Sequence, residues 1–184
     1  MNSLPIMTGE GVFIACYSTS GLRELNFPGS TREGVEAASE PGVGAWHEVT
    51  TAAIKAILRG ILPDQIPPLD LSGHTEFRRK VWAEMQRIPL GRTISYAELA
   101  RRIGQANATR AVGGACGANP IPLIIPCHRV LAAGQGLGGF SGGLEWKRKL
   151  LAIEKIEYAE SGAGARSGWE AQQGFLAGMA QGEN

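Results

Sequence analysis

The sequence predicts an α+β protein in which a small amino-terminal sheet with one helix precedes a mostly helical region. β-branched and aromatic residues concentrate near the amino terminus, whereas apolar residues at helical spacing dominate the later segments. Prolines gather in one stretch between the two regions. These three observations place the sheet first and most of the helices after it.

The amino-terminal region opens with a predicted hairpin in residues 11–28, where two β-prone runs flank Ser20-Gly21. Residues 29–45 are rich in Gly, Ser, Glu and Ala and are expected to form a mobile connection. A helix is predicted over residues 46–60, ending at Gly60. Its apolar residues recur at helical spacing: Trp46, Val49, Ala53, Ile54, Ile57 and Leu58.

A linker is predicted at residues 61–72, which contain three prolines. The chain therefore divides into an amino-terminal α/β domain over residues 1–72 and a second domain over residues 73–158. Residues 159–184 consist mainly of Gly, Ala, Gln and Ser, and this composition predicts a disordered tail.

The second domain opens with a helix predicted over residues 75–88 from its apolar spacing. Ser95 is predicted to cap a short helix over residues 96–103, and the glutamate three residues later completes a capping box. Asn107 is predicted to cap the next helix, over residues 108–118. Two short helices separated by a glycine-containing turn are typical of a helix-turn-helix.

The remainder of the second domain alternates apolar and glycine-rich segments. Residues 121–125 have a β-like, buried pattern that is interrupted by a proline, and the segment Pro-Cys-His-Arg-Val follows at residues 126–130. A glycine-rich loop at residues 134–143 leads to a last helix, predicted from Leu144 to about Glu154.

Charge is nearly balanced along the whole chain, with 18 Lys and Arg against 17 Asp and Glu and a net charge of +1. Net charge alone therefore does not indicate a nucleic-acid partner. The distribution is uneven, since residues 78–110 hold many more basic than acidic side chains while residues 33–76 lean acidic. Given the near-neutral net charge, any affinity for nucleic acid is expected to be modest and to fall as salt rises.

The three cysteines contain no CxxC pair and do not suggest a disulfide framework. The sequence shows no signal peptide and no apolar run of membrane-spanning length. The protein is therefore expected to be cytoplasmic and to have no membrane partner. Three histidines and three scattered cysteines have no zinc-finger spacing, and no metal is predicted.

Cys127 is the candidate nucleophile, since a thiol needs a nearby base to form thiolate at neutral pH and His128 is adjacent. Adjacent side chains of an extended segment point to opposite faces, so a water relay between the two fits better than direct contact. The histidine needs an orienting acceptor, for which Glu154 and Glu145 are both candidates. The alternative interpretation is that Cys127 is a small buried hydrophobic residue.

The string of residues 119–130, NPIPLIIPCHRV, resembles the active-site signature of the O6-alkylguanine-DNA alkyltransferases, also called methylated-DNA–protein-cysteine methyltransferases. The similarity covers roughly residues 74–156. It continues in four further segments, at residues 94–96, 110–115, 139–143 and 151–154.

The resemblance implies a ribonuclease H-like amino-terminal domain and a winged helix-turn-helix-like second domain. It implies an enzyme that moves an alkyl group from O6-alkylguanine in double-stranded DNA to Cys127, with O4-alkylthymine as a second candidate substrate. The product S-alkylcysteine is a thioether without an activated carbonyl for water to attack, so each molecule is expected to act once. No cofactor is needed, because the nucleophile is a side chain.

The resemblance also assigns catalytic roles to five residues. Cys127 accepts the alkyl group, while His128 acts through a water and is held by Glu154. Tyr96 assists rotation of the nucleotide and donates a proton toward guanine N3. Asn119 braces the turn and the active-site segment.

DNA binding is expected from a monomer that enters the minor groove and flips the target nucleotide out of the duplex. Arg110 is implied to fill the vacated stack, although it could equally contact a phosphate. Small residues beside it would let the helix approach the groove closely, or would serve helix packing. The remaining implied contacts to DNA or base are Ala111, Gly113, Gly114, Cys116, Val130, Phe140, Ser141 and Gly142. Phe140 departs from members that carry tyrosine and loses that hydroxyl contact.

Three rival functions remain at this point. The protein could be a non-catalytic alkylguanine-binding relative, in which the cysteine is commonly replaced by tryptophan. It could be a helix-turn-helix regulator that only binds DNA, or a cysteine hydrolase. Transfer of label to the protein separates the alkyltransferase from all three.

Overall fold

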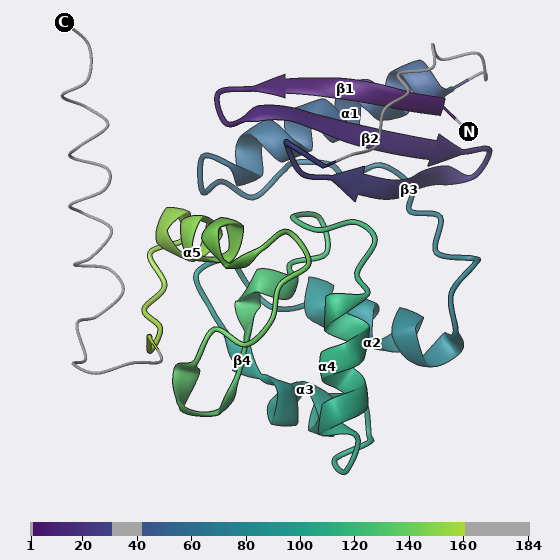
Figure 1. The fold of residues 1–184 in the computed structure, drawn as a ribbon. Coiled ribbons are helices and arrows are strands. Elements are labelled where there is room, and N and C mark those ends of the chain that lie inside the picture. Colours follow the sequence, from purple (N-terminus) through teal and green to yellow (C-terminus); the bar gives the residue numbers. More distant parts are fainter. Residues whose placement is uncertain (1, 31–41, 161–184) are drawn as a thin grey trace, which may run out of the picture.

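The computed structural model describes residues 2–30 and 42–160 as a mixed α/β fold with a small antiparallel sheet (Figure 1). The sheet has the strand order β1 (Asn2–Thr8), β2 (Gly11–Ser18) and β3 (Gly21–Asn26). Strands β2 and β3 form the predicted hairpin, with Ser18 paired to Gly21. The α+β prediction is therefore confirmed.

Strand β1 was not predicted from the sequence. Pro5 lies within it, paired opposite Ile14, and interrupts the β-like pattern. A proline lacks the backbone N–H of a ladder hydrogen bond and is tolerated mainly on edge strands. Because β1 is the edge of this sheet, its outer side needs no such donor.

Helix α1 (Val43–Ile57) packs against the sheet and begins three residues before the predicted start. The chain then turns at Gly60, which has a φ of 71°. A Cβ at this position would lie 2.9 Å from the carbonyl oxygen of Ile153, so glycine is required where the chain passes the end of the last helix. Most of the predicted mobile connection, residues 31–41, lies outside the described residues.

The proline-containing segment 61–72 runs beside β3. The Leu22 amide donates to the carbonyl of Pro68, and the Asp70 amide donates to the carbonyl of Leu22, both at 2.8 Å. These bonds use backbone groups of β3, the edge strand opposite β1. The predicted linker is thus tied to the strand that it follows in space.

Helix α2 (Glu76–Gln86) is capped by Thr75, which was predicted as its first residue. Helix α3 (Tyr96–Arg102) is capped by Ser95, as predicted. The Ser95 hydroxyl accepts from the Glu98 amide at 3.1 Å. Helix α4 (Thr109–Gly117) follows after a short turn.

The prediction that Asn107 caps α4 is wrong. The N-cap residue is Ala108, which has no side-chain cap hydrogen bond. The reason is local: the Ala108 amide donates to the carbonyl of Gln105, so a tight turn leads into the helix without an extended cap residue.

Helices α2, α3 and α4 pack on one another around buried side chains. The fully buried indole of Trp82 donates to the carbonyl of Ala115 at 2.8 Å and so ties α2 to α4. This core holds α4 against α2 and α3. Its principal members are Val81, Trp82, Met85, Leu99 and Val112.

Residues 121–125 are buried, as predicted, but the predicted β-like run is a series of turns. Prolines at 122 and 126 remove ladder donors, and Leu123 has a φ of 70°. The chain continues through a single 3-10 turn, η1 (Cys127–Arg129), into β5 (Val130–Leu131). Strand β5 pairs in parallel with β4 (Ile94–Ser95).

Helix α5 (Leu144–Ile153) ends one residue before the predicted limit. It lies between the sheet and the small β4–β5 pair (Figure 1). After α5 the chain returns, and the Ala159 amide donates to the carbonyl of Gln135. The rest of the predicted tail, residues 161–184, lies outside the described residues. Among those that are described, no helix is long and apolar enough to cross a membrane.

Candidate functional site

Cys127 begins the turn η1, and its side chain is buried, with the residue 4% exposed. Its sulfur accepts a hydrogen bond from Asn119 Nδ2 at 3.1 Å. Burial raises the pKa of the Cys127 thiol to about 11, although the Asn119 amide and the positive charge of Lys147 favour the thiolate. At neutral pH the resting group is therefore a thiol that needs a base.

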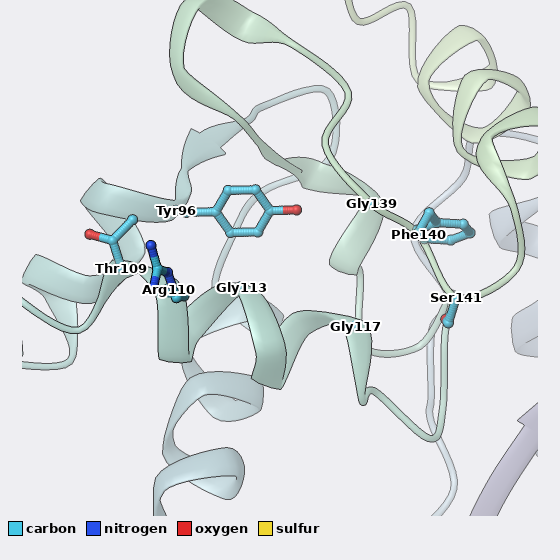
Figure 2. Close-up of a pocket in the computed structure, with 8 residues that line it drawn as sticks. All are labelled: Tyr96, Thr109, Arg110, Gly113, Gly117, Gly139, Phe140 and Ser141. Atoms are coloured by element: carbon cyan, nitrogen blue, oxygen red, sulfur yellow. The ribbon is translucent and has the colours of Figure 1, made fainter.

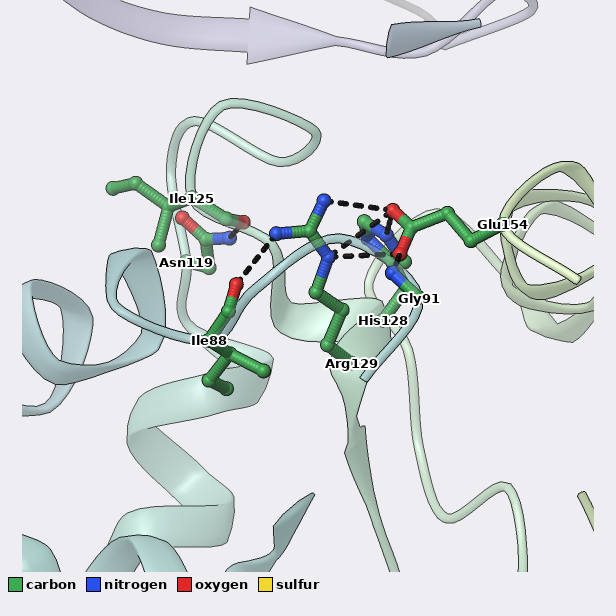
Figure 3. Close-up of polar contacts among 7 residues, drawn as sticks. All are labelled: Ile88, Gly91, Asn119, Ile125, His128, Arg129 and Glu154. Carbon is green, nitrogen blue, oxygen red and sulfur yellow. Dashed lines mark hydrogen bonds and ion pairs between the residues drawn. The ribbon is translucent and has the colours of Figure 1, made fainter. Parts of the chain in front are cut away.

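Asn119 follows α4 and joins three parts of the site. Its Nδ2 also donates to the carbonyl of Ile125 at 2.8 Å, and its Oδ1 accepts from the Ile121 amide at 3.1 Å. Figure 3 shows the contact between Asn119 and Ile125. The buried Asn119 side chain thus holds the 121–125 turns that lead to Cys127.

His128 and Glu154 form a buried pair, with Nε2 2.8 Å from Oε1. This contact selects Glu154 over Glu145, which is exposed in the first turn of α5. Burial raises the pKa of Glu154, but hydrogen bonds from His128 and Arg129 outweigh it and bring the pKa to about 2. Glu154 is therefore a carboxylate at neutral pH.

The ionised carboxylate fixes the tautomer of His128. A carboxylate only accepts hydrogen bonds, so Nε2 must carry the proton and Nδ1 must carry a lone pair. Burial lowers the pKa of His128, which keeps the ring neutral at neutral pH. Nδ1 has no hydrogen-bond partner within the described ranges 2–30 and 42–160 and is available as a base.

Arg129 is a member of this network that the sequence analysis did not single out. Its Nε and Nη2 donate to Glu154 at 2.9 and 2.8 Å, and its Nη1 donates to the carbonyl of Ile88 at 2.7 Å (Figure 3). The Gly91 amide adds a bond to Glu154 at 3.0 Å. A buried carboxylate needs such a counter-charge, so a basic residue directly after Cys-His was the available signal.

Lys147 is a second residue of the site that was not predicted from the sequence. It is fully buried on α5, and its Nζ donates to the carbonyls of Val130, at 2.8 Å, and Leu137. Burial lowers its pKa to about 8, and the nearby Cys127 and Cys116 oppose this shift. The signal was a lysine at helical spacing from Leu150 and Leu151, which form the apolar face of α5.

A pocket of about 590 Å³ lies over α4 (Figure 2). Tyr96 reaches into it from the start of α3, toward the loop that carries Gly139 and Phe140. Burial raises the pKa of Tyr96 to about 12, so the hydroxyl keeps its proton at neutral pH. The lining residues are Tyr96, Thr109, Arg110, Gly113, Gly117, Gly139, Phe140 and Ser141.

The pocket brings together several of the expected DNA and base contacts from three separate segments: Tyr96, Arg110, Gly113, Phe140 and Ser141. Thr109 and Gly117 were not expected there, but they repeat at four-residue spacing with Gly113 on one face of α4. Cys127 is not among the lining residues, but Asn119, which follows α4, donates to its sulfur.

The remaining expected contacts on α4 are divided between its two faces. Ala111 and Gly114 are exposed, as is Arg110. Cys116 is buried, and its sulfur donates to the sulfur of Met85 at 3.5 Å. Cys116 therefore faces the core between α2 and α4, whereas a pocket-lining position was expected for it.

Two expected contacts lie outside α4. Val130 is buried and its carbonyl is held by Lys147, so this carbonyl has a fixed position. Gly142 lies under the ring of Phe27, where an added Cβ would be 2.4 Å from a ring carbon.

No group of three or more metal-ligating side chains is present in the part of the chain that the structure describes. His47 Nδ1 lies 3.2 Å from the hydroxyl of the buried Tyr17. The three cysteines are buried free thiols.

Comparisons with known proteins identify relatives of this chain. Residues 76–156 match the family model described as "6-O-methylguanine DNA methyltransferase, DNA binding domain". A methylated-DNA–protein-cysteine methyltransferase of Mycolicibacterium paratuberculosis is 43% identical over 127 residues, which cover 66% of this chain and 76% of the relative. One from Mycobacterium leprae is 40% identical over 151 residues, covering 82% and 90%.

Solved structures give the same result. The O6-methylguanine methyltransferase of Mycobacterium tuberculosis has a TM-score of 0.68 at 35% identity, covering 84% of this chain and 92% of that one. The M. tuberculosis protein in complex with DNA has a TM-score of 0.66 at 34% identity, covering 84% and 93%. The resemblance noted in the sequence is confirmed, and this chain belongs to the methylated-DNA–protein-cysteine methyltransferase family.

Proposed function

We propose that this protein repairs DNA by transferring an alkyl group from O6-alkylguanine in double-stranded DNA to the sulfur of Cys127. The observation that carries the proposal is the buried chain of contacts from Cys127 through Asn119, with the His128–Glu154 pair beside it. The relatives' names support alkyl transfer, and the M. tuberculosis relative in complex with DNA supports DNA as the partner.

The chemical step begins with the thiol proton. It passes from Cys127 through a water to Nδ1 of His128, and Glu154 stabilises the imidazolium that forms. The sulfur attacks the alkyl carbon, a carbon–sulfur bond forms, and the bond from that carbon to guanine O6 breaks. The electron pair stays on guanine, and Tyr96 donates its phenolic proton toward N3 as the base leaves. The imidazolium then releases its proton and the phenolate takes one up, so that the net transfer is of one proton from the thiol to guanine.

The protein acts once in this scheme. The thioether formed on Cys127 has no activated carbonyl, so water does not regenerate the thiol. No cofactor takes part, because both nucleophile and proton carriers are side chains. O4-alkylthymine is a second candidate substrate, since it presents the same kind of alkyl–oxygen bond.

DNA approaches through α4 in this proposal. Added Cβ atoms at Gly113 and Gly114 would meet nothing within 4 Å, so these glycines are not required for internal packing. A bare, exposed helix face instead suits close approach to the minor groove, with Arg110 filling the space of the flipped base. Helices α3 and α4 then act as a winged helix-turn-helix-like unit within residues 73–158.

We further propose that residues 1–72 form an amino-terminal domain of ribonuclease H-like type. We expect the protein to act as a monomer. The catalytic residues proposed are Cys127, His128, Glu154, Tyr96 and Asn119.

Incubation with a duplex that carries O6-methylguanine, labelled in the methyl group, tests the function. Label should move to the protein in the wild type and in Cys16→Ala, whose thiol lies in the sheet, but not in Cys127→Ala. Tight binding without transfer would support a non-catalytic binding protein or a regulator, and repeated release of label into water would support a hydrolase.

A further inference from the structure

An aromatic cluster joins the amino-terminal sheet to the pocket wall. Phe27 follows β3, and its ring centroid lies 5.7 Å from that of Phe140 and 4.9 Å from that of Trp146 on α5. Phe13 on β2 packs behind them, 5.7 Å from Phe27 and 5.3 Å from Trp146. Phe27, directly after strand β3, therefore contacts the ring of Phe140, which lines the pocket.

Phe27 also lies directly on the backbone of the wall. A Cβ added at Gly142 would be 2.4 and 2.5 Å from two of its ring carbons. Gly142 has no positive φ, so its backbone would accept alanine, and the three atoms nearest to such a Cβ all belong to the Phe27 ring. Phe140 and Ser141, which line the pocket, are next to this contact.

The wall between Gly138 and Gly143 has few restraints of its own. The described backbone hydrogen bonds of this stretch include one within it, from the Gly143 amide to the carbonyl of Phe140 at 3.1 Å. Around it, Lys147 holds the carbonyl of Leu137, the Tyr96 ring packs at Gly138, and the Gly139 backbone interacts with the Tyr96 hydroxyl. Beyond these contacts, the segment with Phe140 and Ser141 packs against the Phe27 ring at Phe140 and at Gly142.

We infer that Phe27 is a positioning residue that sets how far Phe140 and Ser141 stand from α4, and so limits the size of the alkyl group accepted. The inference rests on the proposed function, because it assigns a specificity determinant to the same pocket. A smaller side chain at position 27 lets the Phe140 ring move back and widens the pocket. A large alkyl group then gains access while a methyl group is held less accurately.

Transfer rates from two duplexes, carrying O6-methylguanine or O6-benzylguanine, test this in Phe27→Leu and in the control Phe13→Leu. Phe13 belongs to the same cluster but packs on Phe27 and Trp146 instead of the wall. In Phe27→Leu the ratio of benzyl to methyl rate constants should rise about tenfold, the scale on which pocket size discriminates between substrates. In Phe13→Leu the ratio should stay close to the wild-type value.

A double-mutant cycle keeps the test independent of general stability. Gly142→Ala alone should slow methyl transfer, because its Cβ collides with the Phe27 ring. Combined with Phe27→Leu it should lose less than the product of the two single effects, by a factor of about five or more.

Two results would overturn the inference: a benzyl-to-methyl ratio that changes equally in both Phe variants, or purely multiplicative effects in the cycle. Failure of the proposed function gives a different pattern, since the wild type would then transfer neither group.

Discussion

At the scale of single residues, the site combines a buried thiol with a buried neutral histidine. Before the reaction, Cys127 is mostly protonated at neutral pH, because burial raises the pKa of its thiol to about 11. The Glu154 carboxylate directs the lone pair of His128 to Nδ1, so a base is ready without a change of tautomer. The reaction can therefore begin from the thiol.

The pH dependence of the transfer rate tests this arrangement. The pKa of His128 is lowered below its ordinary 6.5 by burial and Nδ1 is unprotonated at neutral pH, so the single-turnover rate should be level from about pH 7 to 9 and fall only in acid. In His128→Asn the rate should instead rise about tenfold per pH unit up to the pKa of the thiol. A wild-type rate that itself climbs tenfold per unit would contradict the role of His128.

Removing the charge of Glu154 should destabilise the fold. In Glu154→Gln the buried Arg129 loses its counter-charge, at a cost of about 3 kcal/mol in the free energy of unfolding. The control Glu145→Gln, on the exposed first turn of α5, should change it by about 0.5 kcal/mol or less. Urea unfolding of both variants measures the difference, and equal losses would contradict the assigned pairing.

The same pair predicts how stability responds to acid. The folded-state pKa of Glu154, about 2, lies below its ordinary value of 4.5, so its contribution is present above pH 4.5 and is lost as pH falls toward 2. Stability of Glu154→Gln should lack this component and decline less steeply over that range. An identical acid dependence in both proteins would mean that Glu154 is not the paired carboxylate.

At the scale of elements, α4 presents an unusual exposed face. Gly113 and Gly114 lie in its middle, although glycine in a helix costs up to about 1 kcal/mol relative to alanine. Open space beside both positions shows that internal packing does not impose this cost. Close approach of another surface, proposed here to be DNA, accounts for it.

Gly114→Leu separates folding from binding. Leucine is the better helix former, so thermal stability should stay the same or rise. The side chain would project from the exposed face, and the affinity for duplex DNA should fall about 10-fold or more because the backbone can no longer approach the groove. Unchanged DNA affinity, measured by fluorescence anisotropy, would move the DNA-binding surface away from α4.

The helices could be predicted because each has an apolar stripe or a cap that is local in sequence, as with Thr75–Ile88 and Ser95. Strand β1 and the 121–125 turns could not, because prolines break the β pattern and only long-range contacts decide the outcome. The string around Cys127 located the nucleophile. The choice of Glu154 and the burial of Lys147 depend on how α5 packs, which spacing alone does not give.

At the scale of the whole molecule, the sheet and the helical part meet around the active-site segments. The Leu25 amide donates to the carbonyl of Pro120 at 2.9 Å, just before the buried turns that lead to Cys127. Lys149 on α5 pairs with Glu10 in the β1–β2 turn. Together with the Phe27 cluster, these contacts make the sheet a support for the pocket.

The account depends on a single alkyl transfer to one sulfur. Its most direct test is to add an excess of O6-methylguanine duplex to the full chain and follow repaired base by chromatography and modified protein by peptide mass mapping. Repair should stop at one equivalent per protein, with the added methyl group on the peptide that contains Cys127. Repair that continues past one equivalent, or a methyl group on any other residue, would contradict the account.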